Sequence, residues 1–434
     1  MLKEFLVLYF KYYYLFLVEE LKENNIEYII NGKTLVITDL HIGLKKANQS
    51  RLTIIVNVFK NFLKTIKEEN ISNVICCGDI FHSRIALDLQ ALNVGLKLLN
   101  ALAEKCNCYL ILGNHDIYYK NSINVNSTNV FRQNKRIHVI ENPTIALING
   151  QKALFVPWLS NLSNFHQNEF DLMFGHFEIN VDYLIASFIE DNSKDISSDI
   201  SLRELIENDS LLEEVSGDTS NIEKKFNKIK SEKTNSKVIV GKFIELVKEG
   251  GTIFAGHIHN RKEFVTKMRH FVFVGSPYQQ NFGEMNSESG YYVLDEHNRK
   301  KFIATKNVPK HIRINVSDVL KSGIDNYDYT MLSGNIIQKN YDVDIDLETE
   351  SRINQKIADS FPFEEALPNY SIALSADRNV ITNESIETIK KSKLEYIRQY
   401  IQNIDQKTLD SSNLNKDELY KILEKYFKAV TEGI

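Results

Sequence analysis

Tyr109-Leu-Ile-Leu-Gly-Asn-His-Asp116 is a short apolar run that ends in a polar turn. The apolar run predicts a buried strand, which Gly113 ends. Asn114, His115 and Asp116 then place an amide, an imidazole and a carboxylate on one tight turn. In α/β sheets, active sites gather outside the carboxyl ends of the strands. The stretch therefore predicts an α/β protein with a reactive site at the end of this strand.

The same pattern occurs upstream. Residues 73–77 predict a buried strand that runs into Gly78-Asp79, and residues 51–70 and 87–104 predict amphipathic helices. Their expected inner faces are Ile54, Val58, Phe62 and Ile66, and Leu89, Leu92, Leu96, Leu99 and Ala103. Strands and helices that alternate at this spacing predict parallel pairing with right-handed crossovers.

Other segments extend the pattern. We expect a hairpin between strands 26–30 and 34–38, because Asn31-Gly32 favours a type I′ turn. Further strands are predicted at 137–140, 153–156, 171–174, 252–255 and 271–274, and residues 186–236 form a polar, acidic insertion. Residues 311–319 and 336–347 predict strands of a small separate unit, and the chain from 386 onward predicts helices.

Five polar motifs directly follow predicted strands. They are Asp39-Leu40-His41, Gly78-Asp79, Gly113-Asn114-His115-Asp116, Gly175-His176 and Gly256-His257-Ile258-His259. Oxygen and imidazole ligands without thiolate suit Mn²⁺, with Mg²⁺ or Fe as alternatives. Two cations about 4 Å apart need a bridging ligand, and the Asp79 carboxylate is the natural one.

The residues beside the ligands suggest catalytic roles. His115 lies next to Asn114 and can act as a general acid on the leaving oxygen or hydrogen-bond the phosphate. Asp116 either orients His115 or stabilises the turn.

Composition narrows the class of protein. The net charge of −5 argues against a protein-wide basic surface, but local patches and bound cations still allow nucleic acid as a partner. The four cysteines lack zinc-site spacing and predict reduced thiols near a core in a cytosolic protein.

The N-terminal stretch Phe5–Val18 is apolar and aromatic, and Lys11 interrupts it. It is shorter than the roughly 20 residues that span a bilayer, and no cleavage site follows it. We expect a helix packed on a partner or on the main domain, with an interfacial membrane anchor as the alternative.

These motifs resemble the calcineurin-like metallophosphoesterases, and within them the SbcD-type double-strand-break repair nucleases, above all their T-even-like phage branch. The resemblance covers residues 35–295 and rests on longer stretches than the metal motifs alone. They are Gly78–Arg84, His115–Asn121, Asn126–Thr128, Val156–Trp158, Gly175–Asn180 and Val274–Tyr278.

The resemblance implies a site for two divalent cations. Metal one would be held by Asp39, His41, Asp79 and His259, and metal two by Asp79, Asn114, His176 and His257. His82, three residues after the bridging aspartate, joins His115 and Asp116 as a catalytic candidate.

The resemblance also implies an architecture. A two-layered β-sandwich core flanked by helices would span residues 34–300, after an N-terminal extension at 1–33. A small α/β cap that contacts DNA would follow at 301–380, and a helical ATPase-docking tail at 381–434.

By the same resemblance, we expect a metal-dependent DNA exo- and endonuclease that acts in recombination with an SbcC-type SMC-like ATPase. It would be a homodimer within a heterotetramer, in the cytoplasm or a phage host's cytoplasm. The alternatives are a nucleotide or cyclic-nucleotide phosphodiesterase and a non-catalytic scaffold with a vestigial site.

Basic residues in or near the loops after the catalytic strands are candidates for DNA phosphate contacts. They are Lys45, Lys46, Arg51, Arg84, Lys120 and Arg132. The alternative for any one of them is a solvated surface side chain.

Overall fold

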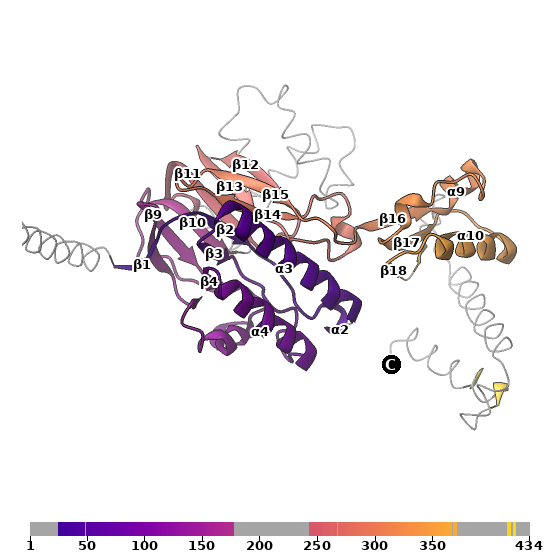
Figure 1. Ribbon diagram of the computed structural model, residues 1–434, viewed down its shortest axis with the longest axis horizontal. Helices are drawn as coiled ribbons and strands as arrows, with labels where there is room; N and C mark the ends of the chain where they lie inside the picture. Colours follow the sequence, from indigo (N-terminus) through magenta and orange to yellow (C-terminus); the bar gives the residue numbers. More distant parts are fainter. Residues whose placement is uncertain are drawn as a thin grey trace, which may run out of the picture. The chain divides into compact units, whose positions relative to one another are not determined.

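The computed structural model describes residues 25–47, 49–177, 243–266, 268–366, 368–370, 415–417 and 420–421 (Figure 1). The chain divides into two compact units, Met1–Asn340 with Ile345–Asn369, and Tyr341–Asp344 with Tyr370–Ile434. Predictions for Phe5–Val18, for the insertion at 186–236 and for nearly all of the tail lie outside the described residues. Within the described residues, no helix has the length and apolar character needed to cross a membrane.

Two large sheets form the core of the first unit. The six-stranded sheet has the order β15 (Lys300–Ala304), β14 (Gly290–Leu294), β2 (Thr34–Ile37), β3 (Asn73–Cys76), β4 (Asn107–Ile111) and β7 (Ile137–Ile140). The seven-stranded sheet has the order β1 (Ile26–Ile30), β8 (Thr144–Ile148), β9 (Gln151–Val156), β10 (Phe170–His176), β11 (Val247–Gly256), β13 (Arg269–Phe273) and β12 (Lys262–Thr266). Strands β2, β3, β4 and β7 pair in parallel, as do β9, β10, β11 and β13.

The two sheets pack face to face around a common core. Val36 and Ile75 of the first sheet and Phe155 and Phe174 of the second belong to one cluster of buried side chains. Residues next to Val36 in sequence point to the opposite face, as strand geometry requires. This arrangement confirms the predicted α/β fold with a two-layered sandwich.

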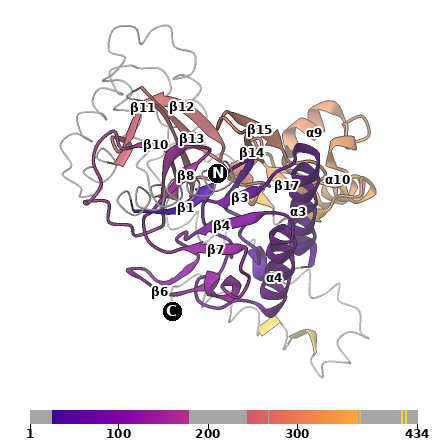
Figure 2. The same cartoon turned by 60° about the vertical axis from the view of Figure 1, so that its left-hand side comes forward.

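Helices cover the outer face of the six-stranded sheet. α3 (Gln49–Glu69) and α4 (Leu89–Ala103) lie side by side there (Figures 1 and 2). Their apolar side chains share a buried cluster with Leu35 and Ile37 of β2. The short helix α2 (Leu44–Ala47) precedes α3 and directly follows the first polar motif.

Smaller elements complete the described chain. β16 (His311–Asn315), β17 (Ile336–Tyr341), β18 (Glu364–Glu365) and β19 (Asn369–Tyr370) form a four-stranded sheet, and β5 (Ile117–Tyr119) pairs with β6 (Ser122–Asn126). The remaining helices are α9 (Val316–Ser322), α10 (Leu347–Asp359) and the 3₁₀ turns η1 (Ser127–Phe131), η3 (Phe282–Glu284) and η4 (Thr330–Leu332).

Four local predictions were wrong. β1 and β2 do not form a hairpin, because β1 pairs with β8 in one sheet while β2 pairs with β3 and β14 in the other. Leu89 is exposed rather than on the inner face of α4, which buries Ala91 and Leu102 instead. The strand expected at 311–319 ends at Asn315, the N-cap of α9. The strand expected at 336–347 ends at Tyr341, and Leu347 is the first residue of α10.

All four cysteines are buried and free of disulfide bonds, as predicted. Burial raises the pKa of every thiol, to about 11 in Cys106 and about 12 in Cys108. The thiols are therefore protonated and screened from solvent.

Candidate metal centre

The five polar motifs meet in one place. Asp39 N donates to Gly78 O at 3.0 Å, and His41 N donates to Asp79 O at 3.1 Å, so the loops after β2 and β3 are joined. From the other sheet, His257 N donates to the Asp39 carboxylate at 3.1 Å. The motifs converge as the strand ends predicted, although the strands belong to two sheets.

Several motif residues have backbone angles that residues other than glycine seldom adopt. The φ angles lie in the left-handed region at Asp39 (50°), His41 (43°), Asp79 (57°) and His257 (80°). Each such residue costs on the order of 1–3 kcal/mol, and this strain collects at functional sites. The surrounding fold therefore holds these four side chains in place against local preference.

A first group of ligand-type atoms consists of Asp39, His41 and His259. The Nε2 atoms of the two histidines are 3.2 Å apart, and each lies 3.7 Å from Asp39 Oδ1. Asp39 Oδ1 is buried and has no hydrogen-bond partner among the described residues, whereas Oδ2 accepts from Thr38 Oγ1 at 2.9 Å. A cation between these atoms would satisfy the orphaned oxygen, so the donor set fits a divalent metal.

A second group consists of Asp39, Asp79 and His176. His176 Nε2 lies 3.4 Å from Asp79 Oδ2 and 2.8 Å from Asn114 Oδ1. His257 Nδ1 approaches the same Asn114 oxygen at 3.1 Å. The side chains expected to hold metal two are thus brought together.

Asp79 belongs to the second group and also faces a histidine of the first. Its Oδ2 is 3.4 Å from His41 Nε2 and 3.4 Å from His176 Nε2, so this oxygen faces a candidate ligand of each predicted metal. A Cβ at Gly113 would overlap the Asp79 carboxylate and backbone nitrogen, so the loop after β4 needs glycine there.

The charges of the site suit cation binding. Burial opposes ionisation of Asp79, but the facing imidazoles of His176 and His41 hold the pKa of its carboxyl below the usual value. Burial and the nearby His176 lower the pKa of His257 to about 4, so this ring is neutral at pH 7. Burial lowers the pKa of His176, but the Asp79 carboxylate raises it further, to about 9. A cation that binds here would therefore displace a proton from this ring.

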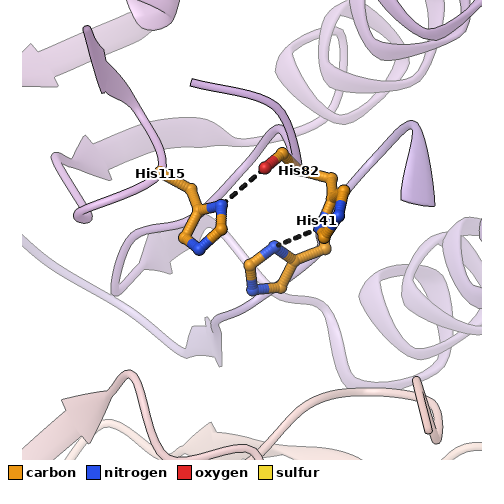
Figure 3. Close-up of side chains that lie close together, drawn as sticks. All are labelled: His41, His82 and His115. Atoms are coloured by element: carbon orange, nitrogen blue, oxygen red, sulfur yellow. Dashed lines mark hydrogen bonds between the residues drawn. The ribbon is translucent and has the colours of Figure 1, made fainter. Parts of the chain in front are cut away.

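A third group consists of His41, His82 and His115 (Figure 3). His115 Nδ1 lies 2.5 Å from the His82 carbonyl oxygen, and the facing Nδ1 atoms of His82 and His41 are 3.4 Å apart. The pKa of His82 is lowered to about 4, mainly by burial and then by the charges of His41 and His115. His115 N also donates to Asp79 Oδ1 at 2.7 Å, which holds the backbone of His115 beside the candidate metal ligands.

Asp116 is placed in its turn rather than against the His115 ring. Its buried carboxylate accepts from the backbone N–H groups of Asp79 at 2.9 Å, Ile80 at 2.9 Å and Gly113 at 2.8 Å. Among the described residues, none of its hydrogen bonds goes to the imidazole of His115. The geometry favours the turn-stabilising alternative.

The candidate DNA contacts have different surroundings. Arg51 is 2% exposed and bonds Glu364 at 3.0 Å, so it was wrong to expect it on a DNA-binding surface. Lys45 is half-exposed and pairs with the same Glu364 at 3.1 Å.

Of the remaining candidates, Arg84 donates to Ile117 O at 3.2 Å, and Arg132 pairs with Glu141. Lys120 is exposed, while the side chain of Lys46 lies outside the described residues. Among the described candidates, Lys120 is the one that is exposed and has neither a hydrogen bond nor an ion pair to another described side chain.

Two neighbours of the centre were not predicted as site residues. Glu284 is buried and lies 2.9 Å from His259 Nδ1. Trp158, the one tryptophan in the chain, has its ring 5.3 Å from that of His257. In the sequence, Trp158 is marked only as the last residue of Val156–Trp158, a stretch that carried the family resemblance. Glu284 is marked only by following another such stretch, Val274–Tyr278.

Known proteins resemble the chain in sequence. Residues 32–261 match the family described as calcineurin-like phosphoesterase. The chain is 21% identical over 377 residues to Exonuclease subunit 1 of Enterobacteria phage T4, covering 85% of this chain and 92% of the phage protein. A solved archaeal phosphodiesterase aligns with 63% of this chain and 99% of its own length, at 12% identity and a TM-score of 0.29.

Proposed function

The chain belongs to the calcineurin-like phosphoesterase family and is a hydrolase, and from that premise we propose that it is a metal-dependent DNA exo- and endonuclease acting in recombination and double-strand-break processing. The similarity to the phage exonuclease subunit carries this proposal. That alignment spans 377 residues, more than residues 32–261 can hold, so it extends beyond the phosphoesterase region.

The proposed metals are two Mn²⁺ ions, held by the ligand sets named above with Asp79 as the shared ligand. When bound, such cations offset the charge that builds on the phosphoryl oxygens and favour ionisation of the attacking water. The orphaned Asp39 Oδ1 and the facing Nε2 atoms of His41 and His259 support this part of the proposal.

The proposed reaction is hydrolysis of a phosphodiester. Water adds to phosphorus, the bond from phosphorus to the leaving sugar oxygen breaks, and that oxygen takes up a proton. His115 suits the role of proton donor in its doubly protonated form, because Nδ1–H then donates to the His82 carbonyl oxygen and Nε2–H is left to protonate the leaving oxygen. The hydrogen bond from His115 N to the Asp79 carboxylate keeps this proton donor next to the proposed metal ligands.

The proposed setting is a complex in the cytoplasm. The phage relative is by name one subunit of an exonuclease, which supports a partner subunit. We assign that role to an SbcC-type SMC-like ATPase, bound by the tail at 381–434, with the cap at 301–380 against DNA and two copies of each chain in a heterotetramer.

Degradation of linear duplex DNA should be compared with hydrolysis of a small chromogenic diester, each with and without Mn²⁺. We expect metal-dependent cleavage of both. Cleavage of the diester without cleavage of DNA would favour a nucleotide or cyclic-nucleotide phosphodiesterase. Cleavage of neither, with metal bound, would indicate a scaffold.

The partner needs its own test. A variant truncated after Asn383 should keep cleavage of the small diester and lose binding to the cognate ATPase in a pull-down. Undiminished binding would show that the tail is not the docking element.

A further inference from the structure

A buried carboxylate outside the predicted ligand set touches the metal centre. Glu284 ends the η3 turn and is 5% exposed. A buried carboxylate is costly unless it is hydrogen-bonded. Its bonds therefore indicate what it is kept for.

Three groups hold this carboxylate. Glu284 Oε1 lies 2.9 Å from His259 Nδ1 and accepts from Asn281 Nδ2 at 2.6 Å, while Oε2 accepts from Gln280 N at 2.8 Å. Both oxygens are engaged, so the carboxylate has little freedom to turn away from His259.

The contact fixes the chemistry of the His259 ring. An ionised carboxylate only accepts hydrogen bonds, so the hydrogen of the imidazole must be on Nδ1. In the neutral ring that binds a metal, Nε2 then carries the lone pair and faces His41 Nε2 at 3.2 Å and Asp39 Oδ1 at 3.7 Å. That is the tautomer and the orientation a metal ligand needs.

The same segment also holds Asp39. Gln280 Nε2 donates to the backbone carbonyl of Asp39 at 2.8 Å and to Ser276 Oγ at 2.8 Å. Asp39 and His259 are distant in sequence, and residues 280–284 form hydrogen bonds with both of them.

We propose that Glu284 is a positioning residue that sets the tautomer and direction of His259 at the first metal site. This inference rests on the metal-binding part of the proposed function and is independent of whether DNA is the substrate. Carboxylates behind ligating histidines typically change metal affinity by about 10- to 100-fold when removed.

The experiment is a calorimetric titration of full-length Glu284→Gln with Mn²⁺. We expect one of two Mn²⁺ sites to weaken by about 10- to 100-fold, with the other little changed. Glu284→Asp, which keeps the carboxylate, should recover part of the affinity. Glu288→Gln is the matched control, because Glu288 is exposed, lies four residues on and pairs with Arg261 at 3.6 Å.

A double-mutant cycle separates positioning from a general structural role. In a His259→Ala background, Glu284→Gln should cause no further loss of Mn²⁺ affinity. An equal loss with and without His259 would overturn the inference, as would wild-type affinity in Glu284→Gln. If the unmodified protein bound no divalent cation at all, the proposed metal centre would fail as well.

Discussion

At the scale of single residues, Asp79 has contacts on every side. Its Oδ2 faces His41 and His176, its Oδ1 accepts from His115 N, and its own N–H is held by Asp116. Loss of its carboxylate would remove the oxygen that faces both His41 and His176, together with the acceptor of the His115 N–H.

We expect Asp79→Ala to lose both cations and all measurable hydrolysis, because neither metal would keep its full set of ligands. His115→Ala should keep both cations while kcat falls by about 10²- to 10⁴-fold, the usual contribution of a general acid. Metal content after gel filtration, measured beside the rate, checks both. Two tightly bound ions in Asp79→Ala would refute the bridge, and metal loss in His115→Ala would make His115 a ligand.

The sequence predicted the polar motifs well because each sits at the end of a strand or directly after it, and strand ends can be located from apolar runs. It did not predict the surroundings of Arg51 or the part played by Glu284. The partner of Arg51 is Glu364, 313 positions along the chain, and the bond of Glu284 to His259 spans 25 positions. Such contacts depend on tertiary folding, which no local pattern reports.

At the scale of elements, the error at β1 and β2 has a local cause. A type I′ turn needs positive φ at both central residues. Of the pair Asn31-Gly32, only Gly32 has it, at 90°. The chain therefore crosses from one sheet to the other at this point, and the two strands end up on opposite layers of the sandwich.

An ion-pair cluster links strand β18 to helices α2 and α3. It consists of Glu364 on β18, Lys45 on α2 and Arg51 on α3. Arg51 is nearly fully buried, and its Nε and Nη1 have no hydrogen-bond partner among the described residues. A buried guanidinium that loses its carboxylate is left uncompensated. Glu364 should therefore stabilise the fold more than a surface ion pair does.

We expect Glu364→Gln to lower the free energy of unfolding by on the order of 3 kcal/mol at pH 7. Burial raises the pKa of Glu364, but the charges and hydrogen bonds of Arg51, and then of Lys45, hold that pKa below the ordinary 4.5. The carboxylate thus contributes stability above pH 4.5 and loses it as the pH falls through the lower folded pKa. Urea unfolding at several pH values measures this.

Glu68→Gln is the control, since Glu68 forms an exposed pair with Lys64 on α3 and should change stability by at most about 0.5 kcal/mol. A Glu364→Gln effect that is no larger than this, or that persists unchanged at low pH, would contradict the assignment.

At the scale of the whole molecule, the net charge is −5, and three of the candidate phosphate contacts, Lys45, Arg51 and Arg132, are already in ion pairs within the protein. We therefore expect the proposed binding to DNA to rest on few phosphate contacts. Affinity should fall only shallowly with salt, because the slope scales with the number of phosphates neutralised.

Lys120→Gln should reduce the salt slope of duplex binding by about one, because Lys120 is exposed on the turn between β5 and β6, close in sequence to His115. Lys64→Gln on α3 is the matched control and should leave the slope unchanged. Fluorescence anisotropy without divalent cations measures binding while cleavage is off. Equal slopes for the Lys120→Gln and unmodified proteins would remove Lys120 from the proposed DNA surface.

Trp158 gives the protein a built-in optical probe. The chain has one tryptophan, and its indole lies 5.3 Å from the ring of His257 and 5.9 Å from that of His176. Emission excited at the red edge of the absorption band therefore comes from this one ring beside two candidate metal ligands, and not from an average over the fold. A paramagnetic ion that enters the centre would quench it, so that loading and exchange of the ion can be followed in real time without a dye or a substrate.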